Sequence, residues 1–373
     1  MAYAYTPGLK VTTGSTIRKD RRLPLKGDVL VQKGDAVRSE DVVARTNRPG
    51  NVQLVNVANL LSIPPEDVND YMHKTEGEAV AKDETLAMTK GIFGLFRSQA
   101  RSPIDGTIET ISNVTGQVIL REPPLPVEMK AFINGTVVEV FADKGVVVEA
   151  YGTYVQGIFG VGREAVGTLN VVVDSPKSPL TPDAIQTTHR DKILVGGSIV
   201  GNDTLQEAIR CGVKGVVAGG INDTDLRKFL GYELGVAITG TEELGITLII
   251  TEGFGQISMA ERTFNLLKDQ EGMQASINGA TQIRAGVVRP EIVIPFEKRE
   301  QSPQTAHESG VLEVDTPIRI IREPYFGQLG RVSALPVELQ QLETEANVRV
   351  LEVELDGGAR ITLPRANVEI IEA

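Results

Sequence analysis

Two stretches of the chain repeat one another, and they constrain the fold more than any other feature. Residues 33–44 (KGDAVRSEDVVA) align with residues 76–87 (EGEAVAKDETLA), and each begins with a glycine–acid pair and ends in alanine. Each copy predicts a turn, a short strand, a charged turn and a second short strand. A second pair, 105–119 and 134–148, alternates apolar residues between matching glycines. Strands this short, with turns every ~8–12 residues, predict compact all-β units.

The repeats resemble biotinyl/lipoyl-type barrel-sandwich hybrid domains. The likeness rests on the glycine–acid turn, the valine and the closing alanine of each copy, followed by Ser-Pro-Ile-Asp-Gly-Thr at 102–107. It implies a barrel-sandwich hybrid β region with internal repeats over residues 24–174. Carriers of that family hold their cofactor on a hairpin lysine, and Lys90 follows Ala-Met-Thr one position later than the family pattern. We expect no cofactor, and a carrier modified at Lys90 remains an alternative.

The stretch around Lys90 combines cations with large apolar side chains and carries no acid. An exposed hairpin tip of this composition is typical of a protein contact. The alternative is that the apolar side chains fold back under their own domain. The residues of this predicted tip are Lys90, Ile92, Phe93, Leu95, Phe96 and Arg97.

Residues 175–295 change to alternating strands and helices after a proline-rich boundary at 175–183. Thr204 with Glu207, and Ser258 with Glu261, predict capping boxes, and Gly212 and Gly231 predict helix ends. The order predicts a small parallel α/β domain with helices over the faces of its sheet. The expected strands are 192–200, 213–221, 246–255 and 291–295, and the expected helices are 204–212, 222–231 and 258–272.

The carboxyl ends of such parallel strands form one edge, where α/β proteins commonly bind ligands. Tight turns and helix caps explain the same residues, and neither a Walker lysine nor a G-x-G-x-x-G fingerprint is present. Binding of a small molecule, or catalysis, at this edge remains an alternative function. The sequence indicates no catalytic residue and no metal site. The residues of this possible ligand edge are Gly196, Gly197, Asp203, Gly219, Gly220, Asp223, Glu252 and Gly253.

The last region, 315–373, follows a polar linker at 296–314 and predicts about five short antiparallel strands around an Asp-Gly-Gly hairpin. Its first stretch, TPIRIIREPYFGQLGRVSAL, resembles the KOW motif of transcription elongation factors and ribosomal proteins. The resemblance implies an SH3-like barrel that binds protein or nucleic acid through one loop. The residues that it places in this contact loop are Arg322, Pro324, Tyr325, Phe326, Gly327 and Arg331.

Charge and composition limit the partners. The net charge of −11 argues against a general nucleic-acid binder. Basic residues concentrate in the N-terminal segment 1–23 and across 18–26, which predicts either a solvated segment or a contact for an acidic or RNA partner. The single cysteine, Cys211, excludes an internal disulfide and favours a buried thiol.

These patterns predict a multidomain chain, mainly β plus α/β. No long apolar segment is present, so we expect a cytoplasmic protein with no membrane span. The predicted function is a non-enzymatic adaptor or scaffold that binds a large assembly, with the transcription or translation machinery, RNA or further copies of the chain as candidate partners.

Overall fold

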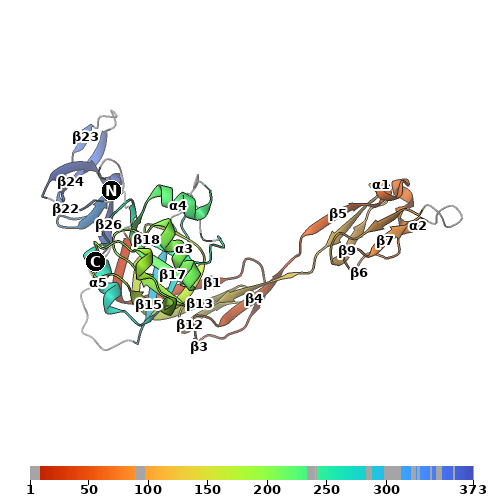
Figure 1. The fold of residues 1–373 in the computed structure, drawn as a ribbon, viewed down its shortest axis with the longest axis horizontal. Coiled ribbons are helices and arrows are strands. Elements are labelled where there is room, and N and C mark those ends of the chain that lie inside the picture. Colours follow the sequence, from red (N-terminus) through yellow and green to blue (C-terminus); the bar gives the residue numbers. More distant parts are fainter. Residues whose placement is uncertain are drawn as a thin grey trace.

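The computed structural model describes residues 9–89, 97–232, 240, 242–282, 288–297, 312–320, 325, 328–336, 338–341, 347–355 and 358–372. The chain is mainly β and elongated (Figure 1). A large body carries a smaller C-terminal half-barrel on one side, and a long arm on the other side ends in a distal module. Within the described part of the chain, no helix has the length and apolar character needed to cross a membrane.

The strands of the body pair in a ring. β14 follows β13 after two residues and pairs with β18, while β13 pairs with β20 at the other end of the series. Between them the pairing runs through β17, β16, β15 and β19. The strands are β13 (Gly145–Gln156), β14 (Phe159–Val161), β15 (Glu164–Val171), β16 (Lys192–Val195), β17 (Gly215–Ile221), β18 (Thr247–Phe254), β19 (Gln274–Asn278) and β20 (Glu291–Pro295).

Only part of this ring is the parallel sheet that the sequence predicts. β15, β16, β17 and β18 are parallel neighbours, whereas β20 runs antiparallel to both β13 and β19. The expected domain boundary at residue 175 lies between β15 and β16, which pair with each other. Strands from both sides of that boundary therefore share one sheet.

Three helices complete the body: α3 (Asn202–Cys211), α4 (Asp223–Leu230) and α5 (Glu261–Asp269). α3 and α4 pack on one face of the parallel strands. α5 belongs to a second core cluster, together with the residues of the same strands that alternate with those of the first cluster. The predicted ends at Gly212 and Gly231 are confirmed, since both adopt the left-handed conformation.

The two predicted capping boxes are wrong. α3 begins two residues before Thr204, whose hydroxyl donates instead to the Leu180 carbonyl, and α5 begins after Ala260 rather than after Ser258. For Thr204, a tertiary hydrogen bond therefore replaces the predicted cap.

The arm begins at a sheet that it shares with the body. β1 (Leu9–Arg22) pairs with β13 as far as Arg22, so the basic N-terminal stretch is part of a long strand of the body. β12 (Gly135–Phe141) pairs with β13 and with β3 (Ala36–Val37). The arm itself contains β2 (Asp28–Val29), β4 (Val42–Arg48) and β11 (Leu125–Lys130), which form a three-stranded antiparallel sheet.

The distal module, residues 49–122, lies between β4 and β11. Its main sheet has the order β5, β10, β9, β6, and β7 pairs with β8 beside it. Its core includes Leu86, Ile108 and Leu120. Its elements are β5 (Val52–Asn56), α1 (Val57–Leu61), the 3₁₀ turn Pro65–Asp67, α2 (Val68–Tyr71), β6 (Ala79–Val80), β7 (Thr85–Met88), β8 (Gln99–Arg101), β9 (Gly106–Ile111) and β10 (Gln117–Arg121).

The sequence repeats are confirmed as one structural unit built twice. Ala36 pairs with Thr136 in the first copy, and Ala79 pairs with Thr107 in the second. The turn glycines make the same bond, from Gly34 N to the Val137 carbonyl and from Gly77 N to the Ile108 carbonyl, both at 2.7 Å.

The charged turns of the two copies are equivalent as well. The Asp41 carboxylate accepts from Arg38 N at 2.7 Å, and the Glu84 carboxylate accepts from Ala81 N at 2.8 Å. The second copy is nested in the first, because the whole distal module lies between the paired strands β4 and β11.

In the described part of the C-terminal half-barrel, five antiparallel strands pair in the order β25, β24, β22, β21, β26, and the short β23 pairs with β24 as a sixth, where the sequence predicts about five. Ile318, Ile320 and Val332 are fully buried in its core. β26 also pairs in parallel with β1 of the body. The strands are β21 (Pro317–Ile320), β22 (Leu329–Ala334), the short β23 (Leu339–Gln341), β24 (Asn347–Leu355), β25 (Arg360–Pro364) and β26 (Val368–Glu372).

Candidate functional site

The predicted contact loop of the half-barrel is placed only in part. Tyr325 is half-buried against the half-barrel core. Arg331 is exposed, and its guanidinium donates to the Asp315 carbonyl at 3.2 Å. The other four predicted residues, Arg322, Pro324, Phe326 and Gly327, lie outside the described residues.

β7 and β8, which flank the predicted hairpin tip in sequence, lie in the distal module, far from the body (Figure 1). Thr89 N donates to the Ser98 carbonyl at 2.9 Å, and Ser98 N donates to the Thr89 hydroxyl at 3.0 Å. These bonds hold together the two ends of the predicted tip, and Arg97 beside them is exposed. Lys90, Ile92, Phe93, Leu95 and Phe96 lie outside the described residues.

The glycines of the possible ligand edge lie against the backbone of the same chain. A Cβ at Gly197 would lie 2.3 Å from the Ser178 carbonyl, and one at Gly219 would lie 2.2 Å from the Ile257 carbonyl. A Cβ at Gly220 would lie 2.0 Å from the Gly255 carbonyl. The chain after β15 and the loop after β18 thus pack onto this edge at distances that only glycine permits.

The other two glycines of this edge have similar roles. A Cβ at Gly196 would lie 2.9 Å from the Leu180 side chain, and Gly253 is buried with a φ of 152°. Backbone packing and an unusual φ therefore account for the glycines here.

The three acids of this edge do not form one cluster. Asp203 is exposed, and Asp223 forms an ion pair with Arg227 of its own helix at 2.7 Å. Glu252 is buried and forms an ion pair with Arg319. Across the residues that the structure describes, no three His, Cys, Asp or Glu side chains are grouped as metal ligands.

The Glu252–Arg319 pair joins the half-barrel to the body. Arg319 lies on β21, and its guanidinium donates to the Glu252 carboxylate and, at 3.0 Å, to the Thr251 carbonyl. The second Glu252 oxygen accepts from Ala260 N at 3.0 Å. The side chains are only 4% and 1% exposed. This buried ionic contact, together with the β1–β26 pairing, fixes the half-barrel on the body.

Several cations of the basic segment form ion pairs within the molecule. Arg18 pairs with Glu149 at 2.6 Å, and Lys19 pairs with Glu291. Tyr154 donates to the same Glu291 carboxylate at 2.8 Å, and burial, reinforced by that negative charge, raises the pKa of the Tyr154 hydroxyl. Both acids lie on strands that the sequence separates widely from residues 18–26, so this pairing was not predictable from local spacing.

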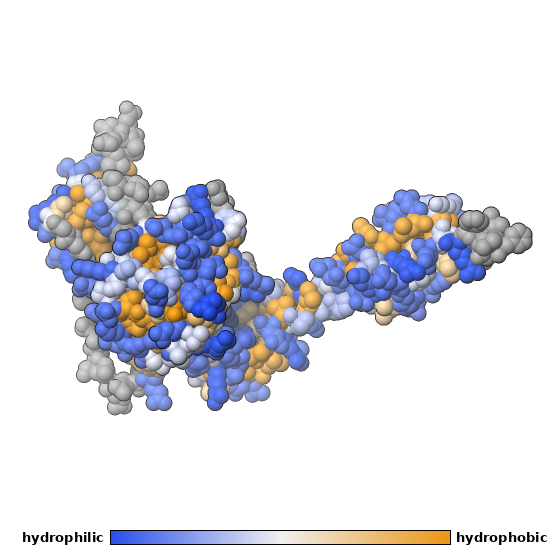
Figure 2. Space-filling model, viewed as in Figure 1, coloured by the Kyte–Doolittle hydropathy of each residue, from blue (hydrophilic) through white to orange (hydrophobic). Residues whose placement is uncertain are grey.

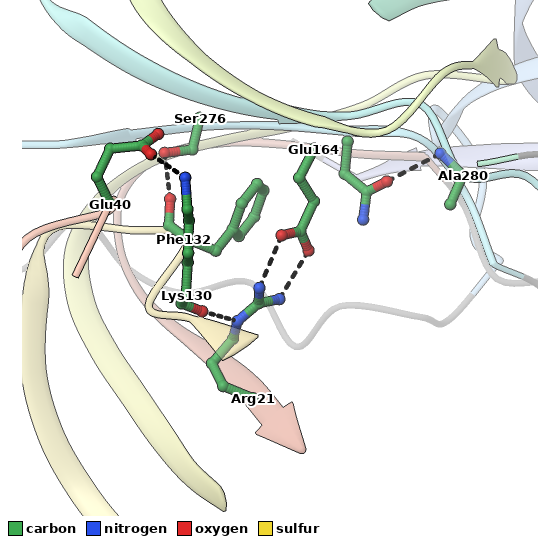
Figure 3. Close-up of polar contacts among 8 residues, drawn as sticks. Arg21, Glu40, Lys130, Phe132, Glu164, Ser276 and Ala280 are labelled. Atoms are coloured by element: carbon green, nitrogen blue, oxygen red, sulfur yellow. Dashed lines mark hydrogen bonds and ion pairs between the residues drawn. The ribbon is translucent and has the colours of Figure 1, made fainter. Parts of the chain in front are cut away.

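Arg21 fixes the root of the arm (Figure 3). Its Nε donates to the Lys130 carbonyl of β11, and its two terminal nitrogens donate to both oxygens of Glu164 on β15, all at 2.7 Å. The guanidinium also lies over the Phe132 ring, 5.3 Å from its centroid. The Arg21 side chain therefore contacts both β11 of the arm and β15 of the body. Its contact with Glu164 has the bidentate geometry that arginine favours.

Phe132 forms the turn between the arm and the body. It is buried and has a φ of 70°, which is rare for a bulky residue. Its N–H donates to the Ser39 carbonyl at 2.9 Å, and its own carbonyl accepts from the Ser276 hydroxyl (Figure 3). These bonds hold the strained backbone in place.

Cys211 is a buried residue of α3, as the sequence predicts. Its thiol lies 3.6 Å from the Glu207 carboxylate, which also binds Arg210. Burial, followed by the hydrogen bond to Glu207, raises the pKa of the thiol. A raised pKa favours the thiol over the nucleophilic thiolate.

The comparisons with known proteins give no match: no family model fits the chain, and no curated protein is significantly similar to it.

Proposed function

We propose that this chain is a non-enzymatic multidomain adaptor that binds a large macromolecular assembly. The contacts would be the hairpin tip at 90–97 and the 322–331 loop of the half-barrel. The observation that carries the proposal is the arm, whose root is fixed to the body by Arg21 and whose far end carries β7 and β8. A fixed spacer that holds a hairpin away from the body suits a protein that connects two partners.

The contacts at the glycine-rich edge favour an adaptor over the ligand-binding alternative. Gly197, Gly219 and Gly220 lie against backbone of the same chain, and Glu252 is already paired with Arg319. A phosphate or metabolite at this edge would have to displace those contacts.

The charges of the half-barrel favour a protein partner over RNA. Residues 315–373 contain six arginines and ten acids. Arg319 binds Glu252, Arg360 binds Glu354, and Arg365 donates to the Val350 and Pro336 carbonyls. Each phosphate contact of an RNA would need a cation, and these three already have partners.

The test is a pull-down of the tagged full chain from its native host, with and without RNase. We expect the double variant Phe93→Ser, Phe96→Ser to lose its protein partners. The control Val114→Ser, at a position of the distal module that is 81% exposed, should retain them. A separate variant, Phe326→Ser, tests the half-barrel loop.

The outcomes separate the proposals. Partners lost by either loop variant and kept after RNase treatment support a protein-binding adaptor. Partners that all variants retain, or a clean protein with no partner, would refute it. An intact mass above the sequence mass would instead identify a modified carrier.

A further inference from the structure

β5 is an edge strand without the usual protection. It pairs with β10 on one side, in a register without a bulge, and no described strand pairs with its other side. Its sequence, Val-Gln-Leu-Val-Asn, contains no charge and no proline. Proteins usually protect an edge with charges, proline, a bulge or a very short strand. The opposite edge, β6, follows that rule because it has only two residues.

The outward face of β5 is apolar as well. Val52 and Leu54 are 47% and 56% exposed and lie on the same face, two residues apart, while Val55 faces the core. Leu60 of the adjacent α1 is 53% exposed. In Figure 2 an apolar surface extends along the distal module where Figure 1 places β5 and α1.

We propose that β5 pairs with β5 of a second copy of this chain, antiparallel, about a two-fold axis at Leu54. Leu54 would then face Leu54 of the second copy, Val52 would face Asn56, and Gln53 would face Val55. The two four-stranded sheets would become one sheet of eight strands. The exposed apolar side chains of both copies would meet on one face.

The charge pattern selects a second copy as the occupant. A two-fold contact places each group near the axis opposite the same group, so any charge there would repel its equivalent. Residues 49–65 contain no charged residue, in a chain in which 23% of residues are charged. This uncharged stretch covers all of β5 and α1.

The shape of the molecule permits this pairing. β5 continues the direction of the arm in Figure 1, and the body lies at the other end of that arm. Antiparallel pairing about Leu54 would direct the two arms opposite ways, so the two bodies would lie on opposite sides of the contact. Neither body would obstruct the other.

Cysteine cross-linking tests the register. In a Cys211→Ala background the full chain has no other cysteine. Leu54→Cys should give a covalent dimer on mild oxidation, because directly opposite Cβ atoms lie ~4.5–5.5 Å apart and a disulfide needs about 3.5–4.5 Å, a gap that small strand movements close. Val52→Cys and Asn56→Cys should each form no covalent dimer alone and should cross-link when mixed. The control Val114→Cys should form no covalent dimer.

Sedimentation of the unmodified full chain tests the same contact without oxidation. We expect a concentration-dependent dimer that Leu54→Lys dissociates, with an unchanged circular dichroism spectrum. A monomer at every concentration, or equal cross-linking of Leu54→Cys and Val114→Cys, would overturn the proposal. The tip variant Phe93→Ser, Phe96→Ser should still dimerise, so failure of this proposal and failure of the adaptor function are distinguishable.

Discussion

Arg319 and Glu252 form a buried ion pair across 67 residues of sequence, and this pair joins the C-terminal half-barrel to the body. The carboxylate is held on its other side by Ala260 N, and the guanidinium also binds the Thr251 carbonyl. Both charges are removed from water, so each depends on the other for compensation.

Removal of one partner should therefore destabilise the junction strongly. We expect Arg319→Met to cost about 3–5 kcal/mol, because it leaves the Glu252 charge buried and unpaired. The double variant Arg319→Met, Glu252→Met should cost less than the sum of the two single changes. Hydrogen exchange of the β21 and β26 amides, which reports opening of the half-barrel, measures the effect.

An exposed ion pair of the same half-barrel provides the control. Arg360 pairs with Glu354, and their side chains are 71% and 47% exposed. Arg360→Met should change stability by less than about 1 kcal/mol. Equal effects of Arg319→Met and Arg360→Met would contradict the role given to the buried pair.

Arg21 should set the direction of the arm. Arg21→Lys keeps the charge but cannot contact Lys130, Glu164 and the Phe132 ring together, so we expect the arm to vary in orientation relative to the body. Small-angle X-ray scattering should show a broader distribution of interatomic distances. Arg18→Lys, at an arginine that is 69% exposed, should leave the distribution unchanged. Identical curves for both variants would disprove the anchoring role.

The nested architecture predicts that the distal module can be removed. Arg48 pairs with Leu125, so the ends of β4 and β11 lie side by side. Replacement of residues 49–124 by Asn-Gly should close them as a two-residue hairpin. We expect the shortened chain to fold, with a circular dichroism spectrum typical of a folded β protein and a cooperative melting transition. An unfolded or aggregated product would show instead that the body depends on the module.

The elements that the sequence predicts correctly are those set by local chemistry. The glycine–acid turns close through local bonds, from Asp35 N to the Gln32 carbonyl and from Glu78 N to the Thr75 carbonyl. The helix ends at Gly212 and Gly231 are local in the same way. Local periodicity also identifies β17, β18 and β20 close to their observed bounds.

What the sequence does not predict is non-local. Pairing of β14 with β18 closes the ring of the body across about ninety residues, and no local pattern specifies it. Arg319 alternates with Ile318 and Ile320 on a strand, which suggests an exposed cation, but docking of the half-barrel buries it. The acids that bind the basic strand β1 are likewise distant in sequence. Such contacts follow from the assembled topology.

Close backbone packing at the glycine-rich edge predicts a sharp contrast between two glycines. Gly197→Ser should destabilise the body by about 1–3 kcal/mol, because its Cβ would lie 2.3 Å from the Ser178 carbonyl. Gly201→Ser should be neutral or slightly stabilising, since its nearest neighbour would lie at 3.8 Å and serine is a favourable N-cap for α3. Thermal melting compares the two, and equal melting temperatures would refute close packing at Gly197.

His189 should make stability depend on pH. Its Nδ1 accepts from Gln186 N at 3.2 Å, and burial, assisted by the charge of Lys192, lowers the pKa of the imidazole below its usual value of 6.5. Below pH 6.5 the unfolded chain binds this proton more readily than the folded chain, so stability should fall as the pH decreases through that range. Above pH 6.5 the imidazole is neutral in both states and contributes no slope. We expect His189→Gln to reduce the loss of melting temperature between pH 8 and pH 5.5. An equal loss in the variant and the natural chain would show that other groups cause it.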